Sequence, residues 1–321
     1  MIEGSGDTES AASRRAAERR SASAGRGDDS RRRARGGPSG EAGQGEPAGR
    51  RRRRGSRRSE TSARVLFAIP AAAFAIFIVV QGGLVFSVAL VGLGVVALHE
   101  LYTLMERVRP VKLAGFLMVA GLVLAAGFGD EFWILLVLVL SFPVTFMFAL
   151  ARPGREDVSW AIAATMFGGL WIGLAFAHAV FLRELPHGAA LVIDVLIGTF
   201  IGDTAAYFGG RAWGRRSLAP LISPNKTLEG AVAGVVGGTL AFWLFAVSYQ
   251  DFFDGRDALI MGLAVALATP VGDLFQSLVK RDLGTKDTGR FFGPHGGVLD
   301  RLDAVFFTAV TGYYAALAVG F

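Results

Sequence analysis

Long apolar runs alternate with short polar connections over most of this chain. About 20 helical residues cross a hydrocarbon core about 30 Å thick, and nine apolar segments come close to this length. They are predicted near residues 64–81, 84–99, 112–128, 132–150, 158–181, 189–210, 229–249, 258–278 and 300–320. The pattern therefore predicts an all-α fold, namely a polytopic helical membrane protein with about nine transmembrane helices.

Residues 1–63 have a different character, because they are mainly Arg, Ser, Gly, Ala and Glu with almost no large apolar side chains. Such a stretch cannot bury enough apolar surface to offset the entropy lost on ordering. We therefore predict a disordered basic tail at 1–63 and a transmembrane domain at 64–321. The sixteen arginines of the tail are interpreted as a solvated segment that fixes topology, with attraction to anionic headgroups as the alternative.

Lysine and arginine sort to alternate connections between the predicted spans. One set of connections is rich in them, whereas the opposite set holds only Arg183 and Arg256. Cytoplasmic loops carry an excess of Lys and Arg in membrane proteins. We therefore expect a multi-pass protein of a bacterial-type inner (plasma) membrane, with its N-terminus and basic loops in the cytoplasm and its C-terminus outside.

The first polar stretch of the predicted membrane domain runs from 202 to 230. Asp203 lies in an otherwise apolar helix near its cytoplasmic end, where an ionisable group is costly and needs a partner or an ion. Ser223 followed by Pro224 predicts an N-cap and the first helical position of the next span. Lys226 and free backbone N–H groups would then lie near a helix N-terminus, which is a setting suited to phosphate.

The second polar stretch begins in the eighth predicted span. Asp273, Ser277 and either Lys280 or Arg281 are three and four residues apart, so on a helix they share one face. The chain contains only four lysines, and three of them fall in the two polar stretches. Because lysine is a compact point charge, this placement indicates contact with phosphate groups.

Asp300 and Asp303 are predicted to lie three residues apart at the start of the last span. Two helix ends that bear carboxylates, joined by a Gly-rich loop with basic residues, suit a divalent cation together with a polyphosphate. Carboxylates plus substrate phosphates are the ligands that Mg²⁺ prefers. By contrast, His99, Glu100 and Glu106 are interpreted as an interfacial amphipathic segment rather than a metal site. The absence of cysteine excludes thiolate metal sites and a cysteine nucleophile.

These residues resemble the signature of the phosphatidate cytidylyltransferases, also called CDP-diacylglycerol synthases. The chain fits the forms S-x-x-K-R-x4-K-D and H-G-G-x-x-D-R-x-D, and the earlier segments 202–204 and 223–230 resemble a second block of that family. Asn225 departs from the lysine expected there. The residues that carry the signature are Ser277, Lys280, Arg281, Lys286, Asp287, Gly293, His295, Gly296, Gly297, Asp300, Arg301 and Asp303.

The resemblance implies transfer of a cytidylyl group from CTP to phosphatidic acid, which gives CDP-diacylglycerol and pyrophosphate with Mg²⁺ as cofactor. It implies catalytic roles for Ser277, Lys280, Arg281, Lys286, Asp287, His295 and Arg301. Substrate-binding roles are expected for Lys226, Ser223, Thr227, Arg211, Gly296 and Gly297, and metal-binding roles for Asp273, Asp300, Asp203 and Asp303. The expected partners are CTP, phosphatidic acid and membrane lipids, with no nucleic acid, and a homodimer is left open.

Two alternatives remain at this point. A CTP-dependent kinase acting on a polyprenol or similar lipid would move the γ-phosphate instead of the cytidylyl group. A transporter would use Asp203 and Asp273 as ion-pathway groups. The polar residues gather at one predicted membrane face instead of the midplane, which favours an enzyme over a transporter.

Overall fold

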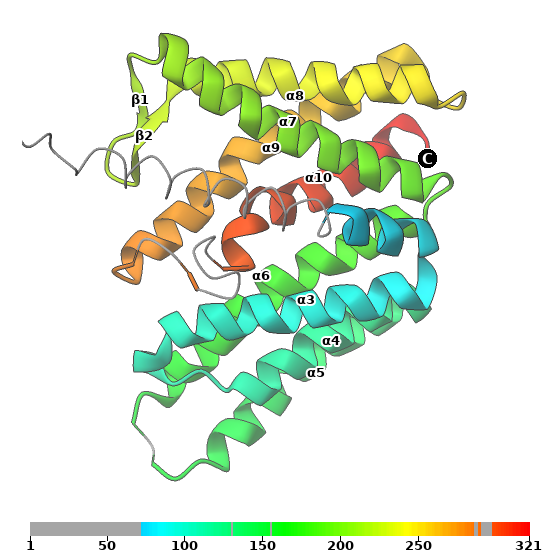
Figure 1. Ribbon diagram of the computed structural model, residues 1–321. Coiled ribbons are helices and arrows are strands. Elements are labelled where there is room, and N and C mark those ends of the chain that lie inside the picture. Colours follow the sequence, from blue (N-terminus) through cyan, green and yellow to red (C-terminus); the bar gives the residue numbers. More distant parts are fainter. Residues whose placement is uncertain (1–71, 130, 155, 286–287, 290–296) are drawn as a thin grey trace, which may run out of the picture. The chain divides into compact units, whose positions relative to one another are not determined.

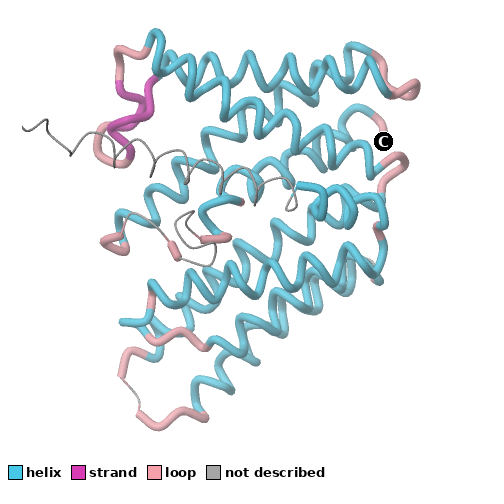
Figure 2. Tube along the Cα trace, viewed as in Figure 1, coloured by secondary structure: helices cyan, strands magenta, loops and turns pink. Residues whose placement is uncertain are grey.

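The computed structural model describes residues 72–129, 131–154, 156–285, 288–289 and 297–321. The predicted tail at 1–63 and the start of the first predicted span lie outside the described residues. The described chain is mostly helical, as Figures 1 and 2 show, and this confirms the all-α prediction. The only strands in the described part are β1 (Ser217–Ala219) and β2 (Ser223–Thr227), which pair antiparallel.

The helices follow the predicted apolar segments closely. A first helix covers Ala72–Gln81, followed by α3 (Gly83–Leu104), α4 (Lys112–Phe128), α5 (Glu131–Leu150), α6 (Val158–Glu184), α7 (Gly188–Trp213), α8 (Leu228–Tyr249), α9 (Gly255–Asp282) and α10 (Asp303–Val319). Two short 3-10 helices are η1 (Glu106–Val108) and η3 (Leu299–Arg301).

The chain is a multi-pass membrane protein. Within the described residues, six helices are long and apolar enough to cross a membrane, namely α3, α5, α6, α7, α8 and α9. The helix Ala72–Gln81 and helices α4 and α10 are apolar but shorter, at 10–17 residues. Nine spanning helices therefore stay a prediction.

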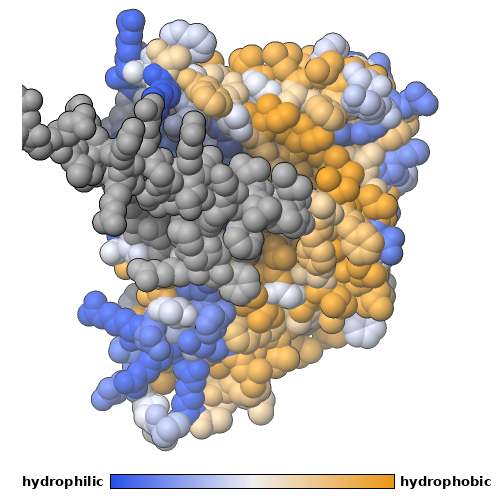
Figure 3. Space-filling view, viewed as in Figure 1, coloured by the Kyte–Doolittle hydropathy of each residue, from blue (hydrophilic) through white to orange (hydrophobic). Residues whose placement is uncertain are grey.

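Helix α6 lies centrally among the described helices (Figure 1). It packs against α3, α4 and α5 on one side and against α10 on the other, and α10 in turn packs against α9. Helices α7 and α8 pack against each other and against α9. In Figure 3, hydrophobic residues cover much of the visible face between hydrophilic residues at its two edges, and the larger hydrophilic groups lie at the left end.

We call this hydrophilic end the basic end. It is formed by the C-terminal ends of α3, α5, α7 and α9 and by the N-terminal ends of α4, α6, α8 and α10. Consecutive helices that run in opposite directions bring these eight helix ends together. Those polar residues singled out in the sequence that the structure describes lie at this end, which matches the expectation that they gather at one face.

Glycines let α7 and α8 approach each other closely. A Cβ atom at Gly238 would lie 2.8 Å from the carbonyl oxygen of Gly198, and one at Gly234 would lie 3.0 Å from that of Gly202. Small residues spaced four apart allow the backbones of membrane helices to come this near. The close contact fixes the backbone of α7 beside Asp203 against α8 and so shapes the site at the basic end.

Candidate active site

A cavity of about 500 Å³ opens at the basic end between α7, α8, α9 and the β-ribbon. Its wall includes residues from both polar stretches of the sequence, although about 40 to 70 positions separate them. The predicted site residues that line it are Asp203, Arg211, Ser223, Lys226, Thr227 and Asp273. The fold therefore brings together predicted metal-binding and substrate-binding groups in one place.

The segment that carries Lys226 is a strand, and the prediction of a helix start at Ser223 is wrong. Residues Ser223–Thr227 form β2, and α8 begins only at Leu228. Thr227 is the N-cap, because its hydroxyl oxygen accepts a hydrogen bond from the Gly230 N–H at 3.1 Å. This cap satisfies an N–H group of the first turn, while Ser223 pairs with Ala219 of β1.

Glu229 fixes the start of α8 to the residues that follow α7. Its Oε2 atom accepts hydrogen bonds from the backbone N–H groups of Arg215 (3.0 Å) and Arg216 (3.2 Å). On the other side of the ribbon, the Arg281 Nε atom of α9 donates to the carbonyl oxygen of Ile222 at 3.3 Å. The β-ribbon is thus held from both α8 and α9, so Arg281 contacts the ribbon in this structure.

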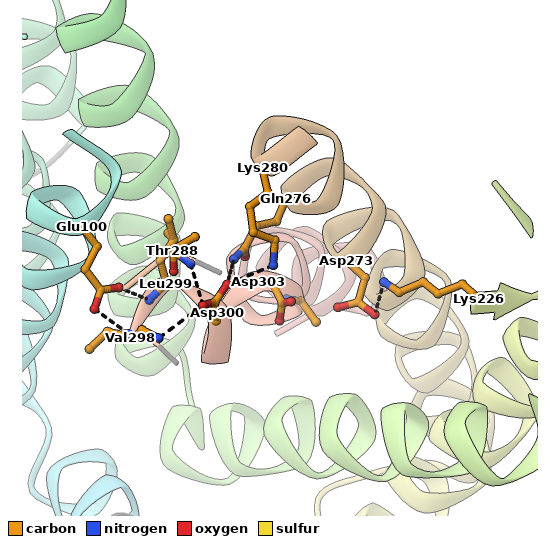
Figure 4. Close-up of polar contacts among 12 residues, drawn as sticks. Glu100, Lys226, Asp273, Gln276, Lys280, Thr288, Val298, Leu299, Asp300 and Asp303 are labelled. Carbon is orange, nitrogen blue, oxygen red and sulfur yellow. Dashed lines mark hydrogen bonds and ion pairs between the residues drawn. The ribbon is translucent and has the colours of Figure 1, made fainter. Parts of the chain in front are cut away.

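Lys226 and Asp273 form an ion pair that joins the ribbon to α9 (Figure 4). The Lys226 Nζ atom lies 2.8 Å from Oδ2 of Asp273, and the two side chains are 32% and 21% exposed. Both residues line the cavity. Because the pair is half-buried, an entering anion can compete with Asp273 for the ammonium group without crossing a closed core.

Lys280 and Asp300 form a second, more buried ion pair. The Lys280 Nζ atom lies 2.9 Å from Oδ1 of Asp300, and Gln276 Nε2 donates to the same oxygen at 3.2 Å. Oδ2 accepts from the backbone N–H groups of Thr288 (2.9 Å) and Gly297 (3.2 Å). We call the connection from α9 to η3, residues 283–298, the signature loop. Asp300 binds two described parts of this loop, at Thr288 and Gly297.

The environment of Asp300 favours its charged form. Burial raises the pKa of this carboxyl, but the hydrogen bonds from Thr288 and from the Lys280 ammonium oppose it, together with the charge of Lys280. The net result is a pKa below the ordinary value. Hydrogen bonds to a carboxylate and a nearby cation both stabilise the ionised state.

Asp300 and Asp303 do not share the first turn of the last span as predicted. Asp300 lies in the 3-10 helix η3, and α10 begins at Asp303. Leu302, with φ −110° and ψ 7°, separates the two elements. The hydrogen bonds that Asp300 accepts from the signature loop hold it in this separate turn.

Asp203, Asp273 and Asp303 form a group of interacting carboxylates. Asp203 interacts electrostatically with both Asp273 and Asp303, and Asp273 and Asp303 also interact with each other. In Figure 4, Asp303 lies between the two ion pairs. Gly272 permits this approach of α10 to α9, because a Cβ atom there would lie 2.7 Å from the carbonyl oxygen of Asp303.

This carboxylate group fits a divalent cation that needs only a few protein ligands. Among the described residues, no three His, Asp or Glu side chains converge as a complete metal-binding cluster. Mg²⁺ keeps several waters and is usually held by one or two carboxylates plus substrate phosphates. Since Asp203 has no hydrogen bond or ion pair within the described part of the chain, its oxygens are available to such an ion.

Glu100 is buried against the segment that carries Asp300, so its interpretation as part of an interfacial segment is wrong. Its side chain is buried, and its two carboxylate oxygens accept from the backbone N–H groups of Val298 (3.1 Å) and Leu299 (3.0 Å). A Cβ atom at Gly297 would overlap this carboxylate. An acidic residue within an apolar segment could have indicated a buried role for Glu100. Its hydrogen-bond partners could not be predicted from the local sequence.

The other predicted residues are placed as follows. Ser277 is half-buried on α9, and Arg301 is exposed in η3. Gln276 and Thr288 were not predicted, although both contact Asp300. Lys286, Asp287, His295 and Gly296 lie outside the described residues.

The model of the cytidylyltransferase family matches residues 62–319, which cover both polar stretches and every described helix. The chain belongs to the cytidylyltransferase family. The predicted resemblance to this family is confirmed.

Curated relatives of this chain include proteins from several bacteria. The phosphatidate cytidylyltransferase of Brucella suis biovar 1 is 29% identical over 265 residues, which are 79% of this chain and 93% of that protein. The phosphatidate cytidylyltransferase of Mycobacterium leprae is 36% identical over 168 residues, or 51% of this chain and 53% of that protein. The uncharacterized protein YnbB of Escherichia coli is 36% identical over 158 residues, which are 48% of this chain and 53% of that protein. The chain thus spans about half the length of the last two.

Proposed function

We propose that this chain transfers a cytidylyl group from CTP to phosphatidic acid and releases CDP-diacylglycerol and pyrophosphate. The observation that carries the proposal is the cavity at the basic end, where Lys226, Asp203 and Asp273 meet in a member of the cytidylyltransferase family. Relatives that match over most of the chain are named phosphatidate cytidylyltransferases. A volume of about 500 Å³ is in the range of small-molecule sites, about 300–1,000 Å³.

The reaction is an in-line displacement at phosphorus. An oxygen of the lipid phosphate attacks the α-phosphorus of CTP, the bond from that phosphorus to the β-phosphate oxygen breaks, and pyrophosphate leaves with the electron pair. The attacking phosphate is already ionised near neutral pH, so no general base is required. Positioning and charge neutralisation therefore supply most of the rate enhancement.

Lys226 and Arg211 contact the phosphate groups in this proposal. Both residues line the cavity, Arg211 near the C-terminal end of α7 and Lys226 near the end of β2. When the triphosphate enters, the Lys226 ammonium exchanges part of its pairing with Asp273 for a phosphate oxygen. Ser223 and Thr227, which also line the cavity, offer hydroxyl groups beside the same anion.

We place the Mg²⁺ site at this carboxylate group, where one or two of Asp203, Asp273 and Asp303 would hold the ion beside the substrate phosphates. When bound, Mg²⁺ would supply neutralisation of phosphate charge and polarisation of the α-phosphate. Asp300 holds the signature loop in place instead, because both of its oxygens already accept hydrogen bonds from the protein. Lys286, Asp287 and His295 belong to the same loop by sequence and keep their predicted catalytic roles.

The basic end faces the cytoplasm in this proposal, and the membrane is the bacterial inner membrane. The basic residues of alternate loops lie on that side, as the positive-inside tendency requires. CTP would then reach the cavity from the cytoplasm, while the lipid would enter from the bilayer. The C-terminus, at the far end of α10, lies outside.

The test is an assay of the purified full-length protein in detergent micelles with phosphatidic acid and Mg²⁺. CTP is labelled at the α-phosphorus in one arm and at the γ-phosphorus in the other. We expect α-label in a lipid-soluble product and γ-label in released pyrophosphate. A parallel assay replaces phosphatidic acid with a polyprenol. The lipid-kinase alternative would there place γ-label in the lipid and α-label in CDP, and absence of turnover with either lipid would reopen the transporter alternative.

A further inference from the structure

A second cavity lies at the basic end, away from the proposed active site. Its volume is about 600 Å³, and it is formed where the connection from α3 to α4 meets the C-terminal end of α5. No residue that lines it also lines the first cavity. The second cavity is therefore a separate feature, which the proposed reaction does not use.

Positive charge converges on this second cavity. Arg109, Lys112 and Arg152 line it, and Glu106 is the one acidic residue in its described wall. Within the described residues, no carboxylate forms an ion pair with Arg109 or Lys112. The three cations that line the cavity thus outnumber its single carboxylate, so a bound anion would balance the remaining positive charge.

The cationic groups are held in place rather than carried on a loose loop. The guanidinium of Arg152 donates to the carbonyl oxygens of Arg109 (2.5 Å) and Pro110 (2.8 Å). The backbone N–H of Val111 donates to the hydroxyl of Thr165 on α6 at 2.7 Å. Pro110 and Val111 are buried, so the loop that presents Arg109 and Lys112 is anchored to α5 and α6.

One flank of the cavity is apolar and continues onto the outer surface of the helices. Leu113 and Phe148 line the cavity, and the exposed side chains of Leu113 (54%), Leu117 (51%) and Met147 (68%) extend along α4 and α5. A ligand that fits both parts has an anionic head and an apolar tail. Basic pockets between membrane helices at the interface suit such headgroups.

We infer that this second cavity is a binding site for the phosphate headgroup of an anionic phospholipid. Arg109 and Lys112 contact the phosphodiester, Arg152 holds their loop, and the acyl chains lie along the apolar surface of α4 and α5. Each basic residue near a membrane surface contributes about 1 kcal/mol, which corresponds to about a fivefold change in affinity. The inference does not depend on the proposed reaction.

The test measures binding of a fluorescent phosphatidylglycerol to the delipidated full-length protein in a neutral detergent. Phosphatidylglycerol is anionic but is not the acceptor in the proposed reaction, so Asp273→Asn should leave its binding unchanged. We expect Arg109→Gln and Lys112→Gln each to weaken binding about fivefold and the double variant about 25-fold. Arg107→Gln is the matched control, because Arg107 lies in the same connection without lining the cavity.

Four results would overturn the inference. Unchanged binding in the double variant would remove the cavity as the site. An equal loss of lipid binding in Arg107→Gln would show that the lipid is attracted to surface charge in general. Displacement of the lipid by an excess of inorganic phosphate, or equally tight binding of labelled phosphatidylcholine, would show that the ligand is not an anionic lipid. Thermal unfolding of each variant identifies any folding defect. If a Gln variant does not fold, the charge-preserving Lys112→Arg variant decides the test, because the inference expects it to bind the lipid like the wild type.

Discussion

The carboxylate of Glu100 accepts a hydrogen bond from the backbone N–H of Leu299 at 3.0 Å, across 199 positions of sequence. Its other oxygen accepts a hydrogen bond from the N–H group of the preceding residue, Val298. Glu100 lies near the end of α3, whereas Leu299 begins η3. The N-terminal half of the domain therefore positions the segment that carries Asp300, which binds the signature loop.

We expect Glu100→Gln to destabilise the protein and to lower activity. The amide of glutamine offers one oxygen where two N–H groups need acceptors, and hydrogen bonds to a charged group contribute about 1.5–3 kcal/mol. Thermal unfolding in detergent should show a loss of about 2 kcal/mol, and cytidylyl transfer should fall further than the folded fraction. Glu106→Gln is the control, because Glu106 is exposed. Equal behaviour of the two variants would contradict the positioning role.

The stability that Asp300 contributes should depend on pH in a defined direction. Its pKa is lower in the folded protein than its ordinary value of 3.8, so the unfolded chain binds the proton more readily. The contribution is therefore fully present above the unfolded pKa and is lost as the pH falls through the lower, folded pKa. At neutral pH, Asp300→Asn should cost about 3 kcal/mol, because it leaves Lys280 buried without its partner.

The check is the difference in unfolding free energy between the wild type and Asp300→Asn as a function of pH. The difference should be largest at neutral pH and should shrink below about pH 4. Asp282→Asn is the matched control, since Asp282 is exposed at the end of α9. A difference that is constant from neutral to acidic pH would contradict the role of the Asp300 charge.

Gly272→Val should separate α10 from α9 and disturb the carboxylate group. The closest atom to an added Cβ is the backbone oxygen of Asp303 at 2.7 Å, and backbone cannot move aside as a flexible side chain can. Overpacking of this kind costs about 1–3 kcal/mol. Gly92→Val on α3 is the control, because nothing lies within 4 Å of a Cβ there. We expect lower thermal stability and activity only in Gly272→Val, and a wild-type profile would contradict the packing argument.

The helical part of the fold could be predicted because apolar run length is a direct physical requirement of the bilayer. The same reasoning placed the polar residues at one end, where Lys226 and Asp273 meet. Ser223 and Pro224 misled the prediction, since this pair is typical of a helix start but here belongs to a strand. The capping hydroxyl is that of Thr227, four residues later.

The partner of Glu100 could not be predicted from local sequence. Spacing along a helix identifies which residues share a face, but it does not identify a backbone N–H group almost 200 positions away. The same limit applies to Asp300. Its bonds to Lys280 and Thr288 depend on how α9 and η3 pack, and no periodic pattern records that packing.

The central claim is that cytidylyl transfer takes place in the cavity at the basic end, and Asp273→Asn tests it most directly. The measurement is the rate of α-label transfer from CTP to phosphatidic acid at several Mg²⁺ concentrations, for Asp273→Asn beside Asp282→Asn, with folding checked by thermal unfolding. Loss of a group that stabilises transition-state charge costs about 10²–10³-fold in rate. The account predicts such a loss in Asp273→Asn and a rate near that of the wild type in Asp282→Asn. A folded Asp273→Asn enzyme with wild-type rate and Mg²⁺ dependence would contradict it.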